Sequence, residues 1–118
     1  IENRERVYKF YEESLVFLCP SRSESFGFSL VEAGYYGNFL ISTKVGVAED
    51  LINNSNYGIL IKPNDINNFS ESFGLFLTNY NSLLNKDRET LLKKYVINTY
   101  DWNLLINKLY TRLENGNL

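Results

Sequence analysis

Residues 15–37, LVFLCPSRSESFGFSLVEAGYYG, decide the fold of this chain. The run at 15–19 is short and apolar and is followed by Pro20, which is typical of a strand buried on both faces in a parallel sheet. Small and polar residues around Gly27 then predict a loop. In an open α/β sheet, ligands bind in the loops that follow the strands, so this stretch predicts a ligand loop.

Helical signals return directly after this loop. Ser29 followed three residues later by Glu32 is a capping-box pair, and Gly37 is typical of a helix end, so we expect a helix over residues 29–36. Backbone N–H groups of the loop would then face a ligand at the positive end of the helix dipole.

The composition is that of a globular protein. With 118 residues and 44% hydrophobic content, the chain is long enough for a single core, which predicts one domain or part of one. It carries 12 Lys and Arg against 14 Asp and Glu, so charge gives no case for a nucleic-acid partner. No apolar run approaches the roughly 18 residues of a membrane span. We expect a cytoplasmic protein, and peripheral contact with a membrane stays open.

The chain has one cysteine, Cys19, and no histidine. One cysteine can form no internal disulfide, so a reducing compartment is expected. Because no histidine can activate its thiol, Cys19 is interpreted as a small buried hydrophobic residue rather than a nucleophile. The chain also lacks methionine, including at position 1, which suggests a piece of a longer protein.

Strand and helix patterns alternate along the rest of the first half. We expect an amphipathic helix over residues 2–14, further apolar strands over 39–43 and 58–61, and a short helix over 48–52 after a tight turn at Gly46. Such alternation predicts an α/β fold with parallel strands and right-handed crossovers.

Three helices are expected after the last strand, the first capped by Asp65 and the third by Asp101. Helical spacing gives each an apolar face that we expect to point inward. The faces comprise Ile66, Phe69, Phe73, Phe76 and Leu77 in the first helix; Leu84, Leu91, Leu92, Tyr95 and Val96 in the second; and Trp102, Leu105, Ile106, Leu109, Tyr110 and Leu113 in the third.

The loop also carries a family resemblance. Its pattern Pro-Ser-Arg-x-Glu-x-Phe-Gly-x-x-x-x-Glu-Ala, over residues 20–33, resembles the donor-site signature of the GT-B retaining glycosyltransferases called glycosyl transferases group 1. Residues 40–49, 56–61 and 100–102 resemble later segments of that family. The resemblance implies that residues 1–118 are the C-terminal portion of a Rossmann-like donor-binding domain and hold three of its six strands. The first half of that domain and the N-terminal acceptor domain would be absent.

The resemblance also implies roles for the loop residues. It assigns Glu24 to the catalytic site, in contact with a hydroxyl of the donor sugar, and Glu32 to the ribose hydroxyls of the nucleotide. Backbone N–H groups would bind the sugar hydroxyls and the diphosphate. The donor-binding set is Glu24, Phe26, Gly27, Phe28, Ser29, Leu30 and Glu32.

Each assignment has a plainer alternative. Glu32 fits a helix cap, Glu24 fits a solvated loop charge, and Phe26 and Phe28 fit core packing, which we expect for at least one of them. Arg22 supports a phosphate or is simply a surface cation.

The function implied is transfer of a hexose from a nucleoside-diphosphate sugar of UDP or GDP type to a glycan or lipid-linked acceptor, as in polysaccharide biosynthesis. No cofactor is expected, and the chain has no Asp-x-Asp motif, which agrees with the metal-independent chemistry implied by the resemblance. The base, the sugar and the acceptor are not determined by these residues. We expect the 118-residue chain alone to be inactive.

The alternative from another class is a non-catalytic α/β module that associates with itself, or a degenerate transferase remnant. In a half sheet, the strand at 15–19 would leave unpaired backbone groups at an exposed edge. We therefore expect a homodimer or larger assembly that hides this edge, unless the helix over residues 2–14 covers it.

Overall fold

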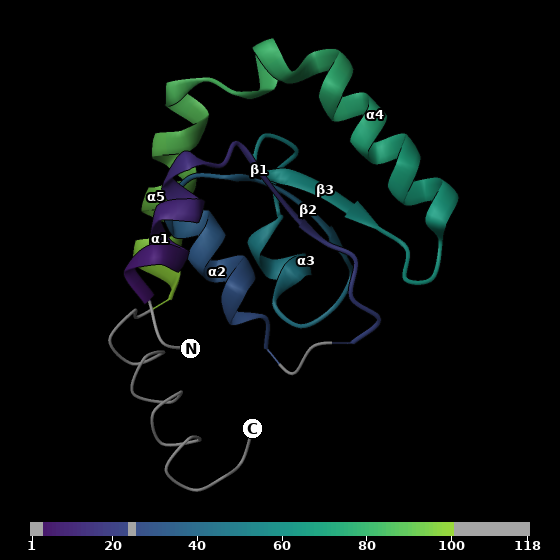
Figure 1. The fold of residues 1–118 in the computed structure, drawn as a ribbon, viewed down its shortest axis with the longest axis horizontal. Coiled ribbons are helices and arrows are strands. Elements are labelled where there is room, and N and C mark those ends of the chain that lie inside the picture. Colours follow the sequence, from purple (N-terminus) through teal and green to yellow (C-terminus); the bar gives the residue numbers. More distant parts are fainter. Residues whose placement is uncertain (1–3, 24–25, 101–118) are drawn as a thin grey trace, which may run out of the picture.

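The computed structural model describes residues 4–23 and 26–100, which alternate between helix and strand before two longer helices (Figure 1). The elements are α1 (Arg4–Glu13), β1 (Val16–Cys19), α2 (Phe28–Tyr35), β2 (Phe39–Thr43), α3 (Ala48–Leu51), β3 (Gly58–Ile61), α4 (Ile66–Leu83) and α5 (Lys86–Thr99).

The three strands form one parallel sheet in the order β1-β2-β3, which confirms the expected α/β fold. Val16 pairs with Phe39, and Leu40 pairs with Gly58. Every residue of the central strand β2 is buried. The strands expected at 39–43 and 58–61 therefore form with the predicted bounds.

Helices cover both faces of the sheet (Figure 1). Phe39 and Ile41 of β2 point to one face, where they pack against Phe76 of α4. Leu40 points to the other face, where the main core includes residues of α2, α3 and α5. This alternation follows from the two-residue period of a strand, and it makes β2 the centre of both apolar layers.

The edge strand β1 differs from the expectation of burial on both faces. It begins at Val16, one residue later than predicted, and Leu15 before it is 61% exposed. Within the strand Leu18 is still 38% exposed. The prediction was wrong because, among the described residues, β1 pairs with β2 alone and its apolar run is not enclosed.

The start of α2 also differs from the prediction. The helix begins at Phe28, its cap is Gly27, and no side chain caps it, so the Ser29–Glu32 capping box does not form. Gly27 has φ of 97°, a left-handed conformation that glycine adopts without strain. The helix ends at Tyr35, one residue before the predicted end, and Gly37 follows its capping residue Tyr36.

Of the helices after β3, α4 has the predicted cap, and the buried faces of α4 and α5 agree with the prediction only in part. The Asp65 side chain accepts a hydrogen bond from the Asn68 amide, 2.8 Å away, which confirms the predicted cap. Phe76, Leu92 and Val96 are buried as expected. Three other expected core residues are exposed instead, namely Ile66 at 81%, Leu77 at 54% and Leu91 at 53%. Leu84 lies in the turn between α4 and α5, and the third predicted helix lies outside the described residues.

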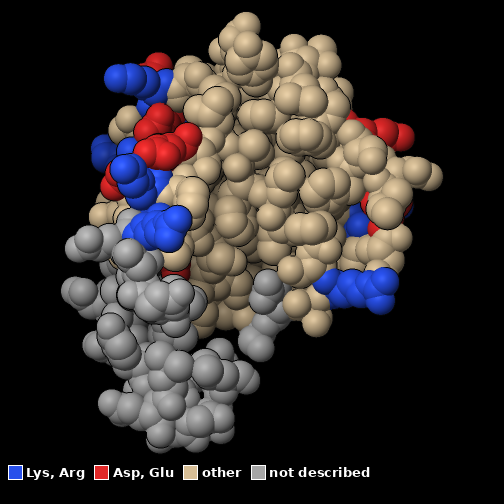
Figure 2. All heavy atoms as spheres, in the orientation of Figure 1, with Lys and Arg blue, Asp and Glu red and all other residues tan. Residues whose placement is uncertain are grey.

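Figure 2 shows one face of the molecule, on which charged side chains gather along the two sides and leave the middle without them. This distribution gives no continuous basic surface on that face. Over the part of the chain that the structure describes, no helix is long and apolar enough to cross a membrane.

Candidate functional site

Three loops meet at one edge of the molecule because the strands that precede them are parallel. They follow the carboxyl ends of β1, β2 and β3. The Val47 amide, in the loop after β2, donates a hydrogen bond to the Phe26 carbonyl, in the loop after β1, over 2.7 Å. A Cβ atom at Gly27 would lie 3.5 Å from Cγ1 of Val47, so these two loops pack directly against each other.

The predicted ligand loop leads into the amino end of α2. The first amides of a helix have no acceptor within the helix, because no helical carbonyl lies one turn earlier. In α2 these include the amides of Phe28 and Ser29. The Leu30 amide instead donates to the Gly27 carbonyl, 3.0 Å away. The Phe28 and Ser29 amides therefore lie at the positive end of the helix, where an anion is stabilised.

The two phenylalanines of the loop pack on each other and on the core. Their ring centroids lie 4.9 Å apart. Phe26 and Phe28 are both half-buried and pack against the main core cluster, which confirms the packing expected for at least one of them. Their side chains therefore anchor the loop.

The two predicted carboxylates have different outcomes. Glu32 is half-buried in α2, and its backbone carbonyl accepts from the Tyr36 amide over 3.2 Å. Burial, followed by the negative charge of Glu12 and smaller effects that include Glu32, raises the pKa of Tyr36. Glu24 lies outside the described residues, so its place relative to Glu32 stays a prediction.

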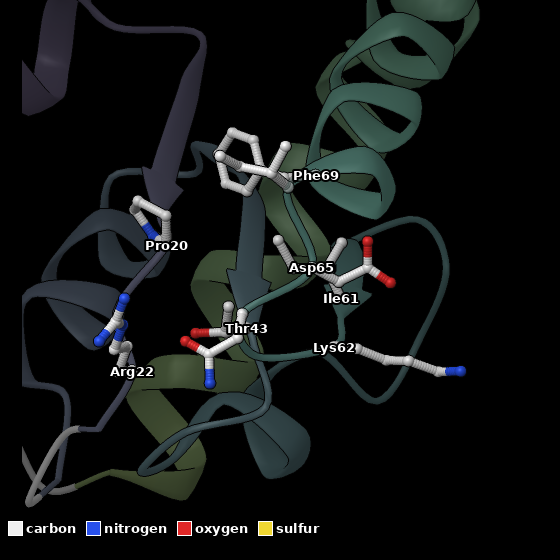
Figure 3. Close-up of a pocket in the computed structure, with 9 residues that line it drawn as sticks. Pro20, Arg22, Thr43, Ile61, Lys62, Asp65 and Phe69 are labelled. Atoms are coloured by element: carbon white, nitrogen blue, oxygen red, sulfur yellow. The ribbon is translucent and has the colours of Figure 1, made fainter.

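A cavity of about 380 Å³ lies at the same edge of the sheet (Figure 3). The Thr43 hydroxyl donates to the Ser21 carbonyl over 2.6 Å, which ties the end of β2 to the start of the ligand loop beside this cavity. In Figure 3 the Lys62 side chain points away from the other labelled residues. The lining residues are Pro20, Arg22, Thr43, Ile61, Lys62, Asn64, Asp65, Ile66 and Phe69.

The cavity brings together residues that sequence reasoning did not connect. Arg22 was considered for a phosphate, and the structure places it on the cavity wall. The sequence predicts Asp65 as a helix cap and Phe69 as part of an inward apolar face, and it gives Asn64 no role. The run Lys62-Pro63-Asn64-Asp65 directly after a strand was the available signal, since loops there meet at the ligand edge. Within residues 4–23 and 26–100, no group of three or more acidic, Cys or His side chains could hold a metal ion.

Comparison with known proteins adds family information to this geometry. The family model "Glycosyl transferases group 1" matches residues 1–95. Sucrose-phosphate synthase from Zea mays is 33% identical over 87 residues, which are 74% of this chain and 8% of that protein. 2-Deoxystreptamine N-acetyl-D-glucosaminyltransferase from Niallia circulans is 34% identical over 70 residues, which are 59% of this chain and 18% of that protein.

Solved structures share the fold. A glycosyltransferase from Rickettsia africae superposes with a TM-score of 0.75 at 23% identity, over 92% of this chain and 29% of that chain. Sucrose-phosphate synthase from Thermosynechococcus elongatus gives a TM-score of 0.73 at 23% identity, over 95% of this chain and 28% of that chain. The chain thus spans less than a third of each of these relatives.

Proposed function

The chain belongs to the glycosyl transferases group 1 family, and from this premise we propose that it supplies the donor-binding part of a retaining GT-B glycosyltransferase. Residues 1–118 would be the C-terminal portion of the donor domain. The parent enzyme transfers a hexose from a nucleoside-diphosphate sugar of UDP or GDP type to a glycan or lipid-linked acceptor.

The observation that carries this proposal is the glycine-capped start of α2 at the carboxyl edge of the sheet. Negative charge develops on the diphosphate as it leaves the sugar, and preorganised amides at a helix amino end stabilise such charge. The Phe28 and Ser29 amides have this position, and Arg22 on the nearby cavity wall can add a positive charge. We assign the diphosphate to these groups.

The carboxylates bind the two sugars of the donor. Glu32 accepts hydrogen bonds from the ribose hydroxyls, because a carboxylate can accept two bonds from a vicinal diol. Glu24 contacts a hydroxyl of the transferred hexose and is the catalytic residue of this set. The backbone of Phe26, Gly27 and Leu30 completes the donor-binding loop.

The proposal is tested by titrating UDP and GDP into the chain and following its backbone amide resonances. We expect shifts at Gly27, Phe28 and Ser29, with a dissociation constant near the millimolar range, or about 4 kcal/mol of binding free energy. Glu32→Gln should weaken binding roughly tenfold, because a hydrogen bond to a charged acceptor is lost. Glu71→Gln, at an exposed position on α4, is the matched control. Shifts confined to α4 and α5 would contradict the assignment.

We expect no turnover of nucleotide sugars by the 118-residue chain itself. The family resemblance assigns cationic groups for the leaving diphosphate and the acceptor groups to other segments of the enzyme. Holding donor and acceptor in the right geometry supplies much of the rate enhancement of a transfer reaction, so donor binding alone does not suffice for turnover. Turnover by the purified chain beyond a mock preparation would refute this expectation.

A non-catalytic, self-associating module is the second candidate. The edge strand β1 favours it, because Leu18 within the strand is 38% exposed and Leu15 directly before it is 61% exposed. The titration separates the two candidates, since an association module has no reason to bind nucleoside diphosphates at the start of α2.

A further inference from the structure

Two tyrosines at the end of α5 hold the short helix α3. The Tyr100 hydroxyl donates a hydrogen bond to the Asp50 carboxylate. The Tyr95 hydroxyl donates to the Asp50 backbone carbonyl over 3.2 Å, and the two tyrosine rings meet edge to face at 6.4 Å. Tyr100 is 9% exposed, so its ring fills a place in the core as well as making this bond.

The Tyr100 ring also contacts the predicted ligand loop. Its centroid lies 6.3 Å from that of Phe26, in the edge-to-face arrangement that aromatic pairs prefer. The Phe26 carbonyl accepts the 2.7 Å hydrogen bond from Val47, which is the capping residue of α3. Phe26 is thus held through its ring by α5 and through its carbonyl by the start of α3.

Asp50 and Val47 both belong to α3, Val47 as its capping residue, so the helix itself links the two contacts. We call the set Tyr100, Asp50, Val47 and Phe26 the Tyr100 brace. It joins α5, α3 and the ligand loop directly before Gly27. Glycine restricts its own backbone less than any other residue, so the direction of the chain at this step depends on what surrounds it. The brace supplies that restraint on the side that precedes the glycine.

We propose that Tyr100 is a positioning residue, which acts through the brace to fix the Phe26–Gly27 step and thereby aims the Phe28 and Ser29 amides at the bound diphosphate. The restraint on the loop follows from the contacts alone. Its effect on the diphosphate rests on the proposed function. Tyr100 itself would touch no reacting atom.

Hydrogen exchange in the 118-residue chain tests the restraint without any ligand. Tyr100→Phe keeps the ring against Phe26 and removes only the bond to Asp50. We expect the Leu30 and Val47 amides to exchange roughly threefold to tenfold faster, as loss of one hydrogen bond implies. The Ile41 amide, in the buried centre of the sheet, should keep its rate.

Matched variants separate the brace from a general loss of stability. Asp50→Ala should reproduce the effect of Tyr100→Phe, and the double variant should add nothing further, because both remove the same bond. Tyr80→Phe removes a hydroxyl from an exposed position on α4 and should change none of these rates. Equal acceleration at Leu30, Val47 and Ile41, or no acceleration, would overturn the proposal.

A titration with UDP and GDP then tests the consequence for binding. Tyr100→Phe should raise the dissociation constant roughly threefold to tenfold if the brace aims the amides. If the unmodified chain binds neither nucleotide, the proposed function fails while the exchange result still decides the brace. If faster exchange leaves the dissociation constant unchanged, the positioning role is refuted and the donor site stands.

Discussion

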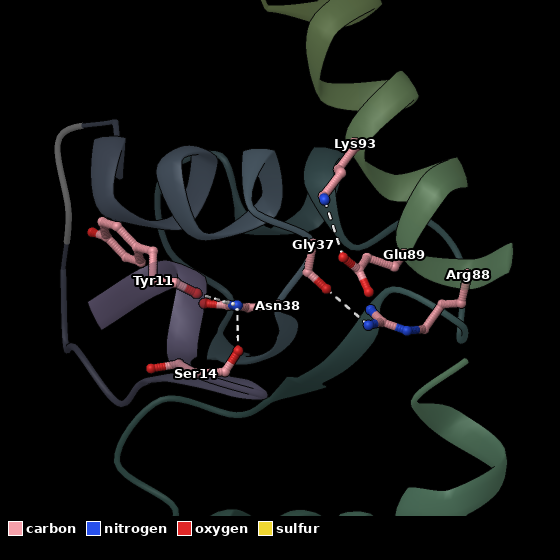
Figure 4. A network of polar contacts seen from close by, with 7 residues as sticks. All are labelled: Tyr11, Ser14, Gly37, Asn38, Arg88, Glu89 and Lys93. Carbon is pink, nitrogen blue, oxygen red and sulfur yellow. Dashed lines mark hydrogen bonds and ion pairs between the residues drawn. The ribbon is translucent and has the colours of Figure 1, made fainter. Parts of the chain in front are cut away.

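Arg88 of α5 is buried at 5% exposure, although it carries a charge (Figure 4). Its Nη2 donates to the Gly37 carbonyl over 2.8 Å, at the end of the turn after α2. Its Nε and Nη1 have no hydrogen-bond partner among the described residues, and its guanidinium lies 5.9 Å from the centre of the Phe39 ring. Burial lowers the pKa of Arg88, because the charged form loses hydration. The apolar stem of this side chain therefore stabilises the fold more than its charge does.

Two substitutions at Arg88 should therefore change the free energy of unfolding by different amounts. Arg88→Met keeps an unbranched apolar stem and should change the free energy of unfolding by no more than about 1 kcal/mol, because replacement of a poorly paired buried charge is close to neutral. Arg88→Ala leaves a cavity and should cost about 2–4 kcal/mol. Urea denaturation gives both values. If Arg88→Met lowered the free energy of unfolding as much as Arg88→Ala, the charge and its hydrogen bond to Gly37 would contribute more to stability than the apolar stem.

The neighbouring ion pair provides the control. Lys93 Nζ lies 3.0 Å from Glu89 Oε1, and the two side chains are 43% and 41% exposed, so solvent screens the pair. Lys93→Ala should therefore change the free energy of unfolding by at most about 0.5 kcal/mol.

Tyr100 makes stability depend on pH. Burial, reinforced by the hydrogen bond to Asp50 and its charge, raises the pKa of Tyr100. Because the folded state keeps this proton where the unfolded state has lost it, the stabilisation is complete below the unfolded pKa of about 10 and declines above it. We expect a slope of at most about 1.4 kcal/mol per pH unit for this group.

Denaturation at several pH values between about 9 and 11 measures this slope. Tyr100→Phe should reduce it, whereas Tyr80→Phe, at a position 46% exposed, should leave it unchanged. An undiminished slope in Tyr100→Phe would assign the pH dependence to other groups, of which Tyr36 also has a raised pKa.

At the scale of elements, the orientation of α2 depends on the residues at its two ends. Gly27 caps its start, and Asn38 follows the turn at its end. The Asn38 side-chain amide donates to the carbonyls of Tyr11 and Ser14, 3.0 and 2.9 Å away, which ties the end of α1 to the start of β2 (Figure 4). The helix therefore reaches the ligand edge with both of its ends fixed.

Gly27→Ala should destabilise the chain by about 1–2 kcal/mol, because an L residue is strained at φ of 97°. The cost comes from the backbone, since the new Cβ would meet Leu30 and Val47 at 3.4 and 3.5 Å, which is ordinary contact. Nucleotide binding, if it uses the α2 amides, should weaken in parallel. Denaturation and titration of the same variant report the two effects.

Gly74→Ala is the matched control in α4, where nothing lies within 4 Å of the new Cβ. Alanine favours a helix interior by up to about 1 kcal/mol over glycine, so this variant should gain stability. If Gly27→Ala also gained stability, the left-handed cap would not be a constraint on the loop.

At the scale of the whole molecule, the open edge of β1 is the feature from which we predict association of the chain. Among the described residues this strand pairs with β2 alone, and Leu18 within it and Leu15 directly before it are exposed. Unpaired backbone groups beside apolar surface favour pairing with another strand. We therefore expect assembly through this edge.

Sedimentation tests this expectation with a pair of variants. Leu18→Lys, at an exposed position, should weaken assembly and leave the chain folded. Phe17→Lys should weaken both assembly and folding, because Phe17 packs on the core and its ring lies 6.0 Å from that of Tyr11. A well-folded monomer of the unmodified chain at high micromolar concentration would contradict the prediction.

The sequence by itself determined the alternation of elements, the bounds of β2 and β3, the Asp65 cap and the glycine that follows α2. These features depend on residue types within one turn or one strand, so local patterns suffice to predict them. The family could be predicted for the same reason, since its signature lies in one continuous loop. The position of Glu24 and the roles of the donor-binding residues remain predictions.

Only the tertiary structure decided which apolar residues are buried and which residue caps α2. Leu18 and Leu77 follow their apolar patterns and are still exposed. Gly27 replaces Ser29 as the cap of α2, and its carbonyl accepts hydrogen bonds from the Leu30 and Val31 amides of the first turn. The contact between Tyr100 and Asp50 joins residues 50 positions apart. Burial and long-range contacts depend on what lies across the fold, and local sequence patterns carry no information about those neighbours.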